Sequence, residues 1–542
     1  MKTREFPREL NSSKYVLIHY SKTFLMNLKL ANIGIFGFAI IAFVLLCQEY
    51  IYFTIDDSFI FYRYSDNIAN GFPFSFNYND EPEFGFTSYL YTIIVAIGIK
   101  LGFDPITFSK SVTIFSSICI MFIVSYSIKI FTENKFKLYF LASLPLAFTP
   151  YFAFHSVIGM ETTLFGFLFT ASVISYGCFL KTEKKIFLVL AIISSIFSIF
   201  TRYESILVPM SFFVYLAYQR IFLKDGVKIS TVLINFIPFI FLISLLFVNM
   251  NIFGQYLPNP FYVKESREIS DVVRSISEIL KFLTYSSPFL LLFLLKLKTN
   301  LQNKFSSFLI IQVVVSLFPF IFITQWINPF HRYYIHEFPT LVLLGILSLY
   351  LIKDKLEIGR FSKISITFVL IFLITFNLTS SADVSKYTFS QATGLETTHI
   401  TIGKILGKYT ELSHNTIATV PDAGAVPFYS KWQTYDYVLN DKATVQEGFS
   451  IERFYDADPK FIFFYSVGNK NFESMDVVKK NFVEVTSISA KGHHDEIVNH
   501  EKFKNFDLIA VYPKMFIFAE KDFVNNNPNL MNELIQNSLH GK

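Results

Sequence analysis

Long apolar stretches separated by short polar segments make up most of this 542-residue chain as far as about residue 380. A helix needs about 20 apolar residues to cross a bilayer. Runs of that length, or slightly shorter, occur at 31–53, 107–131, 137–154, 162–180, 186–201, 205–222, 231–253, 279–296, 305–325, 339–352 and 361–378. The pattern predicts an α-helical polytopic membrane protein with about eleven transmembrane helices.

The distribution of Lys and Arg decides where a further, shorter apolar run at 87–101 lies. Loops on the cytoplasmic side of a membrane carry an excess of Lys and Arg. If 87–101 lies flat on the outer surface, basic clusters such as Lys181, Lys184 and Lys185 face the cytoplasm. If it crossed the membrane, every later loop would change sides. We therefore predict an outer interfacial helix within a first outer loop at 54–106, a cytoplasmic N-terminus and an extracytoplasmic C-terminal region.

The pattern changes near residue 380, where charge rises and the apolar runs shorten to the length of strands. The sequence predicts a helix at 397–410 and four strands, at Thr416–Pro421, Gln433–Val438, Lys460–Tyr465 and Leu508–Tyr512. We therefore predict a transmembrane module at 1–379, followed by a small extracytoplasmic α/β domain at 380–542. Asp422-Ala423-Gly424-Ala425 has no second glycine pattern and no Lys, which favours a plain strand-to-helix turn over a nucleotide loop.

Composition agrees with a membrane protein. Hydrophobic residues make up 52% of the chain and charged residues 16%, against about 25% charged residues in an ordinary soluble domain. The net charge of +5 is explained by basic inner loops, so we expect no nucleic-acid partner. The three cysteines, Cys47, Cys119 and Cys178, lie inside apolar runs, which predicts small core residues rather than disulfides.

Two adjacent carboxylates, Asp56 and Asp57, follow directly after the first apolar run. Acids at the water end of a transmembrane helix are costly to place and usually have a function. Asp56 could also cap a helix running from Asp57 to Asn70, with Gly71 as its end. The residues alone leave two interpretations open: a capped helix on the membrane surface, or reactive carboxylates at the depth of the lipid headgroups.

The segment DDSFIFYRYSDNIANGFPFSFNYNDEPEFGFTSYLYT, from Asp56 to Thr92, resembles the first outer loop of a known bacterial family. The family consists of polyprenyl-phosphate-sugar-dependent glycosyltransferases with the multi-span GT-C architecture, and it includes arabinofuranosyltransferase-like enzymes. The shared features are an Asp pair, an aromatic-Arg-aromatic step, a turn and a helix start: Asp56-Asp57, Tyr62-Arg63-Tyr64, Asn70 to Asn77 and Gly85 to Ser88. The acid that the family places directly before the glycine sits one position earlier here, at Glu83.

The resemblance implies a GT-C glycosyltransferase of the bacterial inner membrane. Such an enzyme moves a sugar from a polyprenyl-phosphate donor to a cell-envelope glycan, a lipid-linked saccharide or a protein on the outer face. The arabinofuranosyltransferase-like relatives make arabinofuranose the sugar that the resemblance implies. Nothing in the residues themselves selects a pentose over a hexose.

Three acids at the outer ends of apolar runs are the catalytic candidates: Asp56, Asp57 and Glu161. Sugar transfer to a hydroxyl needs a base near the acceptor, at a depth that the lipid phosphate can also reach. A carboxylate at the outer end of a span meets both demands. Gly159-Met160-Glu161-Thr162 also resembles the GxET step of the family, although Glu161 could simply complement the dipole of the following helix.

Polar and aromatic side chains of the outer loops are the substrate-binding candidates. A lipid phosphate needs a cation, and Arg can donate two parallel hydrogen bonds to it. Two loops resemble family motifs: Thr201-Arg202-Tyr203-Glu204 resembles TRxE, and Leu257 to Lys264 resembles LPNTFYxK with Pro260 in place of Thr. Arg202 and Glu204 could instead pair with each other, and Arg332 could anchor to headgroups. The candidates are Arg63, Arg202, Glu204, Asn259, Tyr262, Lys264, His331, Arg332 and Tyr333.

Two alternatives remain at this stage. One is a transporter or flippase of lipid-linked saccharides without catalytic chemistry. Transporters tend to place acids at the bilayer midplane and to show internal repeats, whereas the acids here lie at span ends and we find no repeat. The other is a binding or assembly protein that uses the C-terminal domain to grip glycan. A divalent cation is a separate question, since Asp56, Asp57 and Glu161 could hold one. Three acids without His are no metal signature, so we assign no metal ligand and no cofactor.

Overall fold

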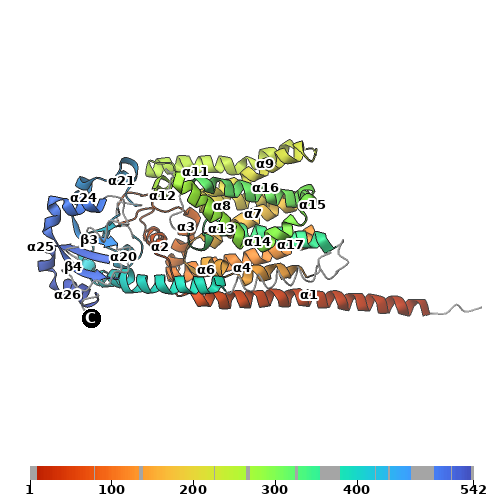
Figure 1. Ribbon diagram of the computed structural model, residues 1–542, viewed down its shortest axis with the longest axis horizontal. Helices are drawn as coiled ribbons and strands as arrows, with labels where there is room; N and C mark the ends of the chain where they lie inside the picture. The colour runs from red at the N-terminus through yellow and green to blue at the C-terminus, as the bar shows by residue number, and fades with distance from the viewer. Residues whose placement is uncertain are drawn as a thin grey trace, which may run out of the picture.

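The computed structural model describes residues 9–538, apart from 79, 134–137, 225, 227, 264–268, 324–327, 354–378, 421–422, 437–439, 466–492 and 514. A helical bundle occupies most of the chain, and a five-stranded sheet near the C-terminus lies at one end of it (Figure 1). We call the described residues from 396 onward the sheet region, and the adjoining end of the bundle the sheet end. The N-terminal helix extends beyond the opposite end of the bundle (Figure 1).

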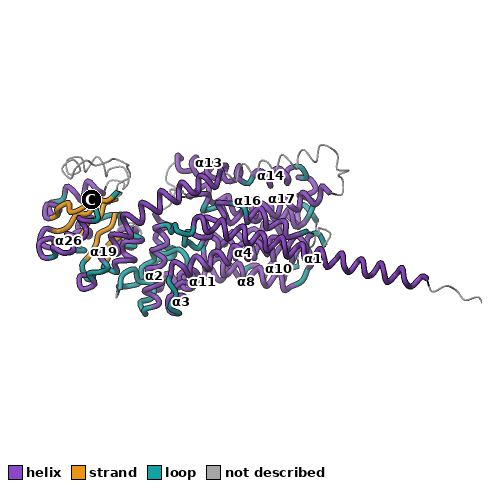
Figure 2. The backbone as a smooth tube through the Cα atoms, turned by 90° about the horizontal axis from the view of Figure 1, so that it is seen from below, coloured by secondary structure: helices purple, strands orange, loops and turns teal. Residues whose placement is uncertain are grey.

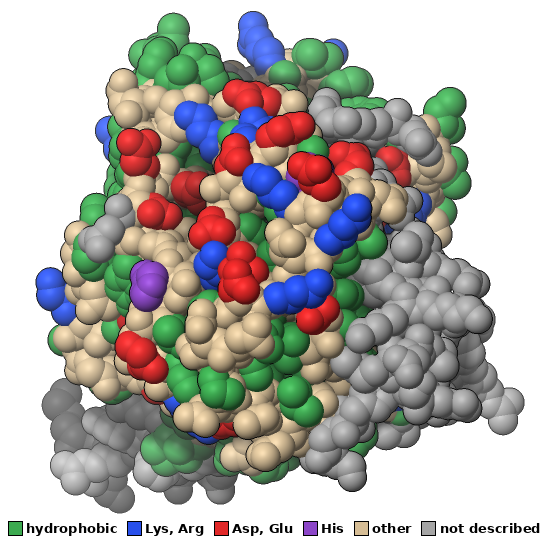
Figure 3. Space-filling model, turned by 90° about the vertical axis from the view of Figure 1, so that its left-hand side faces the viewer, with side chains coloured by type: hydrophobic (Ala, Val, Ile, Leu, Met, Phe, Trp, Pro, Cys, Tyr) green, Lys and Arg blue, Asp and Glu red, His purple; other side chains and the backbone are tan. Residues whose placement is uncertain are grey.

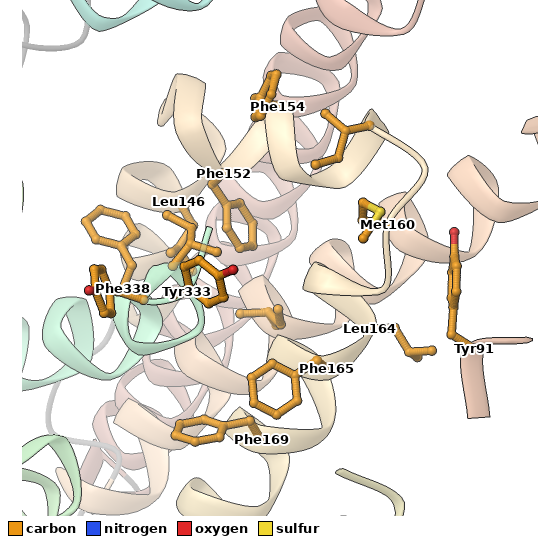
Figure 4. Packing of buried hydrophobic residues seen from close by; sticks show 14 of the residues in the cluster. Tyr91, Leu146, Phe152, Phe154, Met160, Leu164, Phe165, Phe169, Tyr333 and Phe338 are labelled. Atoms are coloured by element: carbon orange, nitrogen blue, oxygen red, sulfur yellow. The ribbon is translucent and has the colours of Figure 1, made fainter. Parts of the chain in front are cut away.

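Helices build the bundle. They are α1 (Glu9–Tyr50), α2 (Asp56–Ala69), α3 (Tyr89–Lys100), α4 (Pro105–Phe131), α5 (Ser143–Ala147), α6 (Pro150–Val157), α7 (Thr162–Thr182), α8 (Lys185–Thr201), α9 (Leu207–Ile221), α10 (Ile229–Asn235), α11 (Ile237–Phe253), α12 (Asn259–Val263), α13 (Ile269–Tyr285), α14 (Ser287–Leu294), α15 (Leu297–Gln302), α16 (Lys304–Leu317) and α17 (Phe338–Lys353). Buried apolar side chains of these helices form one continuous core. In it, Phe152 and Phe154 of α6 join Met160, Phe165 of α7 and Tyr333 (Figure 4).

Fewer helices qualify as membrane spans than the sequence predicts. Among the described residues, five stretches are long and apolar enough: Leu28–Tyr50, Pro105–Phe131, Thr162–Thr182, Ile229–Phe253 and Lys304–Phe322. Two bent helix pairs raise the number to seven if each pair forms one span. The predicted runs at 186–201, 205–222 and 339–352 are helical, but α8, α9 and α17 have only 17, 15 and 16 residues. The run at 361–378 lies outside the described residues, so eleven spans remain a prediction.

The predicted span at 137–154 is a bent pair, Tyr139–Ala147 and Pro150–Val157, with an angle of 71° between its two parts. The predicted span at 279–296 needs the same correction. The structure instead has two helices, α13 and α14, that meet at an angle of 74°. Pro288 follows the break, and a proline fits the first turn of a new helix but cannot donate the backbone hydrogen bond that an unbroken helix would need there. Helix α13 begins ten residues earlier than predicted, at Ile269, because its polar residues interrupt the apolar run on which the prediction relied.

Helix α3 matches the predicted interfacial helix at 87–101. Ser88 caps it by accepting a hydrogen bond from the backbone N–H of Tyr91, at 3.4 Å. With 12 residues, α3 is too short to cross a bilayer alone. It packs against α2, α4 and α8, at the side of the bundle that carries the first outer loop.

The sheet region contains a mixed sheet with strand order β2-β1-β3-β5-β4. Strand β1 pairs in parallel with β2 and β3, whereas β5 pairs antiparallel with β3 and β4. The strands are β1 (Thr416–Val420), β2 (Gln433–Asp436), β3 (Pro459–Tyr465), β4 (Phe506–Tyr512) and β5 (Met515–Glu520). The helices are α19 (Thr401–Leu406), α20 (Ala425–Ser430), α21 (Lys442–Glu447), α22 (Ile451–Asp456), α24 (His493–Asn499), α25 (Lys521–Asn526) and α26 (Pro528–Gln536). The four predicted strands are confirmed, and β5 is an additional one.

A helix at 379–395 leads from the bundle into the sheet region (Figure 2). It lies along the end of α1, where the hydroxyls of Tyr50 and Ser381 are 3.0 Å apart. The hydroxyls of Tyr52 and Thr388 are also 3.0 Å apart. These contacts tie the start of the sheet region to the point where the first apolar run ends.

The two ends of the molecule expose different kinds of side chain. Acidic and basic side chains are interspersed over the face of the sheet region that points away from the bundle (Figure 3). The bundle exposes large apolar side chains along its helices, among them Ile193, Phe197, Ile240, Ile243 and Phe247. Helices in contact with lipid need apolar side chains on their exposed surface, so these side chains suit a bundle that lies in a membrane.

Candidate active site

Two arginine–carboxylate pairs lie at the sheet end of the bundle, and both arginines are buried. Arg332 Nη1 donates to Asp57 Oδ2 at 3.1 Å. Arg202 Nε donates to Glu161 Oε1 at 2.7 Å, and its Nη1 lies 3.4 Å from Glu204 Oε1. The structure thus brings together five of the predicted site residues from separate loops. We call these contacts the arginine pairs.

Helix α2 is held against the turn that carries Glu161. The hydroxyl of Ser58 donates to the carbonyl oxygen of Ile158 at 2.9 Å, and the hydroxyl of Tyr62 donates to that of Gly159 at 3.3 Å. A Cβ at Gly159 would lie less than 3.0 Å from the Tyr62 hydroxyl, and its φ of +83° also favours glycine. This close approach fixes the distance between the first outer loop and Glu161.

Arg332 follows a strained stretch of backbone. Phe330 and His331 both have positive φ, at 49° and 63°, which residues other than glycine rarely adopt. A ring nitrogen of His155, Nε2, lies 2.9 Å from the carbonyl oxygen of Phe330 and helps to hold this conformation. The consequence is that the chain reverses sharply and presents Arg332 to Asp57. Strain of this kind is common at functional sites.

The members of the Glu161–Arg202 pair keep each other ionised. Burial alone would raise the pKa of Glu161, but the positive charges of Arg202 and then Arg332 hold it below its ordinary value. Burial alone would lower the pKa of Arg202, but Glu161 and then Glu204 raise it. The site therefore carries fixed opposite charges in a place from which water is largely excluded.

Each arginine has a donor that makes no hydrogen bond to a described residue, although Arg202 Nη1 is ion-paired with Glu204 at 3.4 Å. Arg332 Nε and Arg202 Nη1 are buried and make no hydrogen bond to any residue within the described ranges. A buried guanidinium donor without an acceptor costs free energy, so such a donor is expected to meet an anion when the site is filled. Both arginines lie close enough to Glu161 to act on its charge, and donors of this kind suit an oxyanion such as a phosphate.

Asp56 points away from the arginine pairs. Its Oδ2 accepts from the backbone N–H of Gly424 at 3.1 Å, and its Oδ1 from that of Ala425 at 2.9 Å. The structure thus corrects the expectation that Asp56 caps its own helix, because α2 has no side-chain cap. The predicted strand-to-helix turn lies between β1 and α20, although residue 422 is outside the described residues, and Asp56 binds the start of α20.

Arg63 binds protein groups rather than the arginine pairs. It is buried and donates from Nε to the carbonyl oxygen of Phe76 at 2.6 Å, and from Nη2 to that of Trp432 at 2.9 Å. It also donates to the Pro427 carbonyl and to the Asn77 side chain. Four of its five N–H groups are therefore used to hold the first outer loop against the sheet region.

The LPNTFYxK-like segment lies beside the first outer loop. The backbone N–H of Asn259 donates to the carbonyl oxygen of Phe84 at 2.8 Å, and its side-chain oxygen accepts from Gln255 at 2.6 Å. Tyr262 is 39% exposed. Lys264 lies outside the described residues. The binding roles of Asn259, Tyr262 and Lys264 remain predictions.

Comparison with known proteins now adds to this geometry. No protein-family model and no curated protein sequence matches the chain. Among solved structures, the chain is similar to ArnT from Cupriavidus metallidurans bound to undecaprenyl phosphate, with a TM-score of 0.58 at 10% identity over 90% of this chain and 97% of that one. It is also similar to the Archaeoglobus fulgidus oligosaccharyltransferase, with a TM-score of 0.54 at 10% identity over 90% of this chain and 73% of that one. This chain has the GT-C fold.

The GT-C fold confirms the architecture that the first outer loop implied. At 10% identity, the likeness concerns the fold alone. Within the described parts of this GT-C fold, no group of three or more His, Cys, Asp and Glu side chains is arranged to hold a metal ion. Asp57 and Glu161 face arginines, and Asp56 faces backbone amides, so these acids do not fit a shared metal and we derive no step through one.

One residue at the site escaped the sequence analysis. Tyr387, on the helix at 379–395, lies close enough to Asp57 and Arg332 to interact with both charges, and burial raises the pKa of its hydroxyl. Its ring also packs edge-on against Phe330, with centroids 5.2 Å apart. Nothing in the surrounding sequence marks this tyrosine, because only the fold brings it to the site.

His331 is held neutral beside the site, which gives a testable pH dependence. Burial lowers its pKa to about 4, against about 6.5 in an unfolded chain. The unfolded chain therefore binds a proton first, and stability should fall by ~3 kcal/mol as the pH drops from about 6.5 to about 4. We expect the apparent melting temperature of His331→Asn in detergent to fall less over this range than that of the wild type.

The matched control for this measurement is His414→Asn, because His414 is exposed. Its melting temperature should follow that of the wild type at every pH. An equal acid sensitivity of wild type and His331→Asn would contradict the effect of burial.

Proposed function

We propose that this chain is an integral-membrane glycosyltransferase. It moves a sugar from a polyprenyl-phosphate donor to a hydroxyl group of a cell-envelope glycan, a lipid-linked saccharide or a protein. The observation that carries the proposal is the pair of buried arginines, each with a donor that makes no hydrogen bond to a described residue, set against Asp57 and Glu161 at one end of an apolar bundle. This end is the outer face of the inner membrane, and the donor phosphate lies there at headgroup depth.

In the proposed reaction, Arg332 and Arg202 bind the donor phosphate. Asp57, which is 34% exposed, is within reach of an entering acceptor. It takes the proton of the acceptor hydroxyl as the acceptor oxygen forms a bond to the anomeric carbon. The bond between that carbon and the phosphate oxygen breaks, and polyprenyl phosphate leaves with the electron pair.

Charged and polar side chains around the donor phosphate have supporting parts. Glu161 holds Arg202 charged and in place, and Glu204 adds a second negative charge beside it. Arg332 neutralises Asp57 in the resting site and exchanges this partner for phosphate when the donor binds. Tyr333 lies near enough to Arg202 to raise its pKa further. Such fixed charges stabilise the charge that develops on the leaving phosphate.

The solved structures with this fold support a lipid-phosphate donor. The ArnT structure was obtained with undecaprenyl phosphate, and an A. fulgidus AglB structure, with a TM-score of 0.50 at 11% identity over 80% of this chain and 69% of that one, with dolichol-phosphate. The resemblance of the first outer loop points to arabinofuranose as the first sugar to test. Polyprenyl-phosphate hexoses should be tested beside the arabinofuranose donor.

The proposal is tested by transfer in liposomes that contain the purified full chain and a panel of polyprenyl-phosphate sugars. We expect transfer by the wild type from at least one donor. Arg332→Ala should raise KM for that donor about 10-fold to 100-fold, because it removes a charged hydrogen bond to phosphate worth about 1.5–3 kcal/mol. The KM of Arg332→Lys should lie between those of the wild type and Arg332→Ala, since Lys keeps the charge but cannot donate two parallel hydrogen bonds as Arg does.

The matched control is Arg274→Ala, which removes an exposed arginine from α13. It should leave KM unchanged. Absence of transfer from every donor by the wild type would overturn the proposal, and movement of lipid-linked sugar between leaflets without transfer would favour a flippase. An unchanged KM in Arg332→Ala would remove Arg332 from the phosphate site.

A further inference from the structure

The sheet region binds helix α2 along most of its length. Helices α2 and α20 run side by side in the same direction, because their starts and their ends meet. At the start, the Asp56 carboxylate accepts from the first amides of α20. In the middle, the ring of Phe59 lies 5.5 Å from that of Phe428. At the end, Lys431 Nζ lies 2.5 Å from Asp66 Oδ2.

The loop after α2 extends this contact. The side-chain oxygen of Asn77 accepts from the backbone N–H of Thr434 at 2.9 Å, and its nitrogen donates back to the Thr434 carbonyl at 3.1 Å. The hydroxyl of Tyr64 donates to Asn440 at 3.0 Å. The first outer loop and the sheet region are therefore joined by buried polar contacts and aromatic packing.

The two adjacent acids are divided between the two parts of the molecule. Asp56 binds α20 of the sheet region, and Asp57 binds Arg332 of the bundle. They are consecutive residues at the first turn of one helix, so a shift in the backbone of one moves the other. A displacement of about 1 Å of a catalytic group can cost ~10²-fold in rate.

We infer that Asp56 is a positioning residue, which holds Asp57 at the arginine pairs by clamping the start of α2 to α20. The sheet region is then part of the catalytic unit. This inference rests on the proposed function. Both oxygens of Asp56 accept backbone N–H groups of the sheet region, which is the arrangement of a carboxylate that holds a helix in place.

Gly424 allows the contact to be broken from the other side. A Cβ at this position would lie less than 3.0 Å from the backbone oxygen and the carboxylate of Asp56. Gly424→Ala therefore pushes α20 away while Asp56 itself stays intact. The matched control is Gly37→Ala in α1, where a Cβ meets nothing within 4 Å.

The experiment measures kcat and donor KM for the full chain as wild type, Asp56→Ala, Gly424→Ala and the double variant. We expect kcat to fall about 10-fold to 100-fold in each single variant, with KM within about 2-fold of the wild type. The double variant should be no slower than the slower single one, because both changes break the same contact. Gly37→Ala should behave as the wild type.

Hydrogen exchange at 424–430 supplies a readout that does not depend on activity. Faster exchange in Asp56→Ala than in the wild type supports the clamp, and unchanged exchange overturns it. A wild-type kcat in Gly424→Ala, or losses that multiply in the double variant, would also overturn it. If the wild type transfers no sugar, the proposed function fails, and the exchange measurement still decides whether the clamp exists.

Discussion

Asp57→Asn is expected to lower kcat for sugar transfer by about 10²–10⁴-fold, which is the usual contribution of a general base. Asn keeps the shape of the side chain and an oxygen that can accept from Arg332, but it cannot take a proton. Donor binding should change far less than kcat, since the substitution leaves both arginines in place. The measurement is single-turnover transfer in liposomes at saturating donor.

Glu81→Gln is the control for this experiment. Glu81 is an exposed carboxylate in the same loop, so its conversion to an amide should leave kcat unchanged. A wild-type kcat in Asp57→Asn would contradict the carboxylate mechanism. The same loss in Glu81→Gln would point to a change in the charge of the whole loop rather than to a base at Asp57.

Glu161→Ala is expected to destabilise the protein by about 3–5 kcal/mol, because it leaves the buried guanidinium of Arg202 without its nearest partner. Glu204, at 3.4 Å, can compensate only in part. The double variant Glu161→Ala/Arg202→Ala removes both charges and should be less destabilised than Glu161→Ala alone. The measurement is the free energy of unfolding from denaturant titration in mixed micelles.

Glu133→Ala tests the same kind of contact at an exposed place. Lys181 and Glu133 are 2.8 Å apart but 39% and 59% exposed, so the loss should stay below about 1 kcal/mol. A cost for Glu161→Ala as small as that for Glu133→Ala would show that Arg202 is well solvated. A double variant as unstable as the single one would show that the cost comes from the cavity rather than from the charge.

The sequence predicted those features that depend on neighbouring residues. The strand at Thr416 is recognisable from its own composition, and the helix stop before Gly71 from a single glycine. The pairing of Arg202 with Glu204 was a local alternative, and the structure does place them 3.4 Å apart. Its shorter contact, with Glu161 at 2.7 Å, joins two different loops.

The partners of Asp56 and Asp57 could not be predicted in this way. Asp57 binds Arg332, which lies 275 positions later, and Asp56 binds Gly424, which lies 368 positions later. An aspartate that caps its own helix and an aspartate that binds the start of a distant helix have the same neighbours in the sequence. Only the packing of α2 against α20 decides between them. The sequence did not predict strand β5. It begins at Met515, shortly after β4 ends at Tyr512, so the two apolar segments are difficult to separate by pattern.

The contacts of Arg63 set an order for the making of the protein. This buried arginine donates to carbonyl groups of Pro427 and Trp432, which lie 364 and 369 positions further along the chain. At 5–20 residues per second, the ribosome needs roughly tens of seconds to supply them. Until then Arg63 can donate only to acceptors in its own loop, such as the carbonyl oxygen of Phe76 and the side chain of Asn77. The joint between the first outer loop and the sheet region can therefore form only after the chain as far as Trp432 has been synthesised.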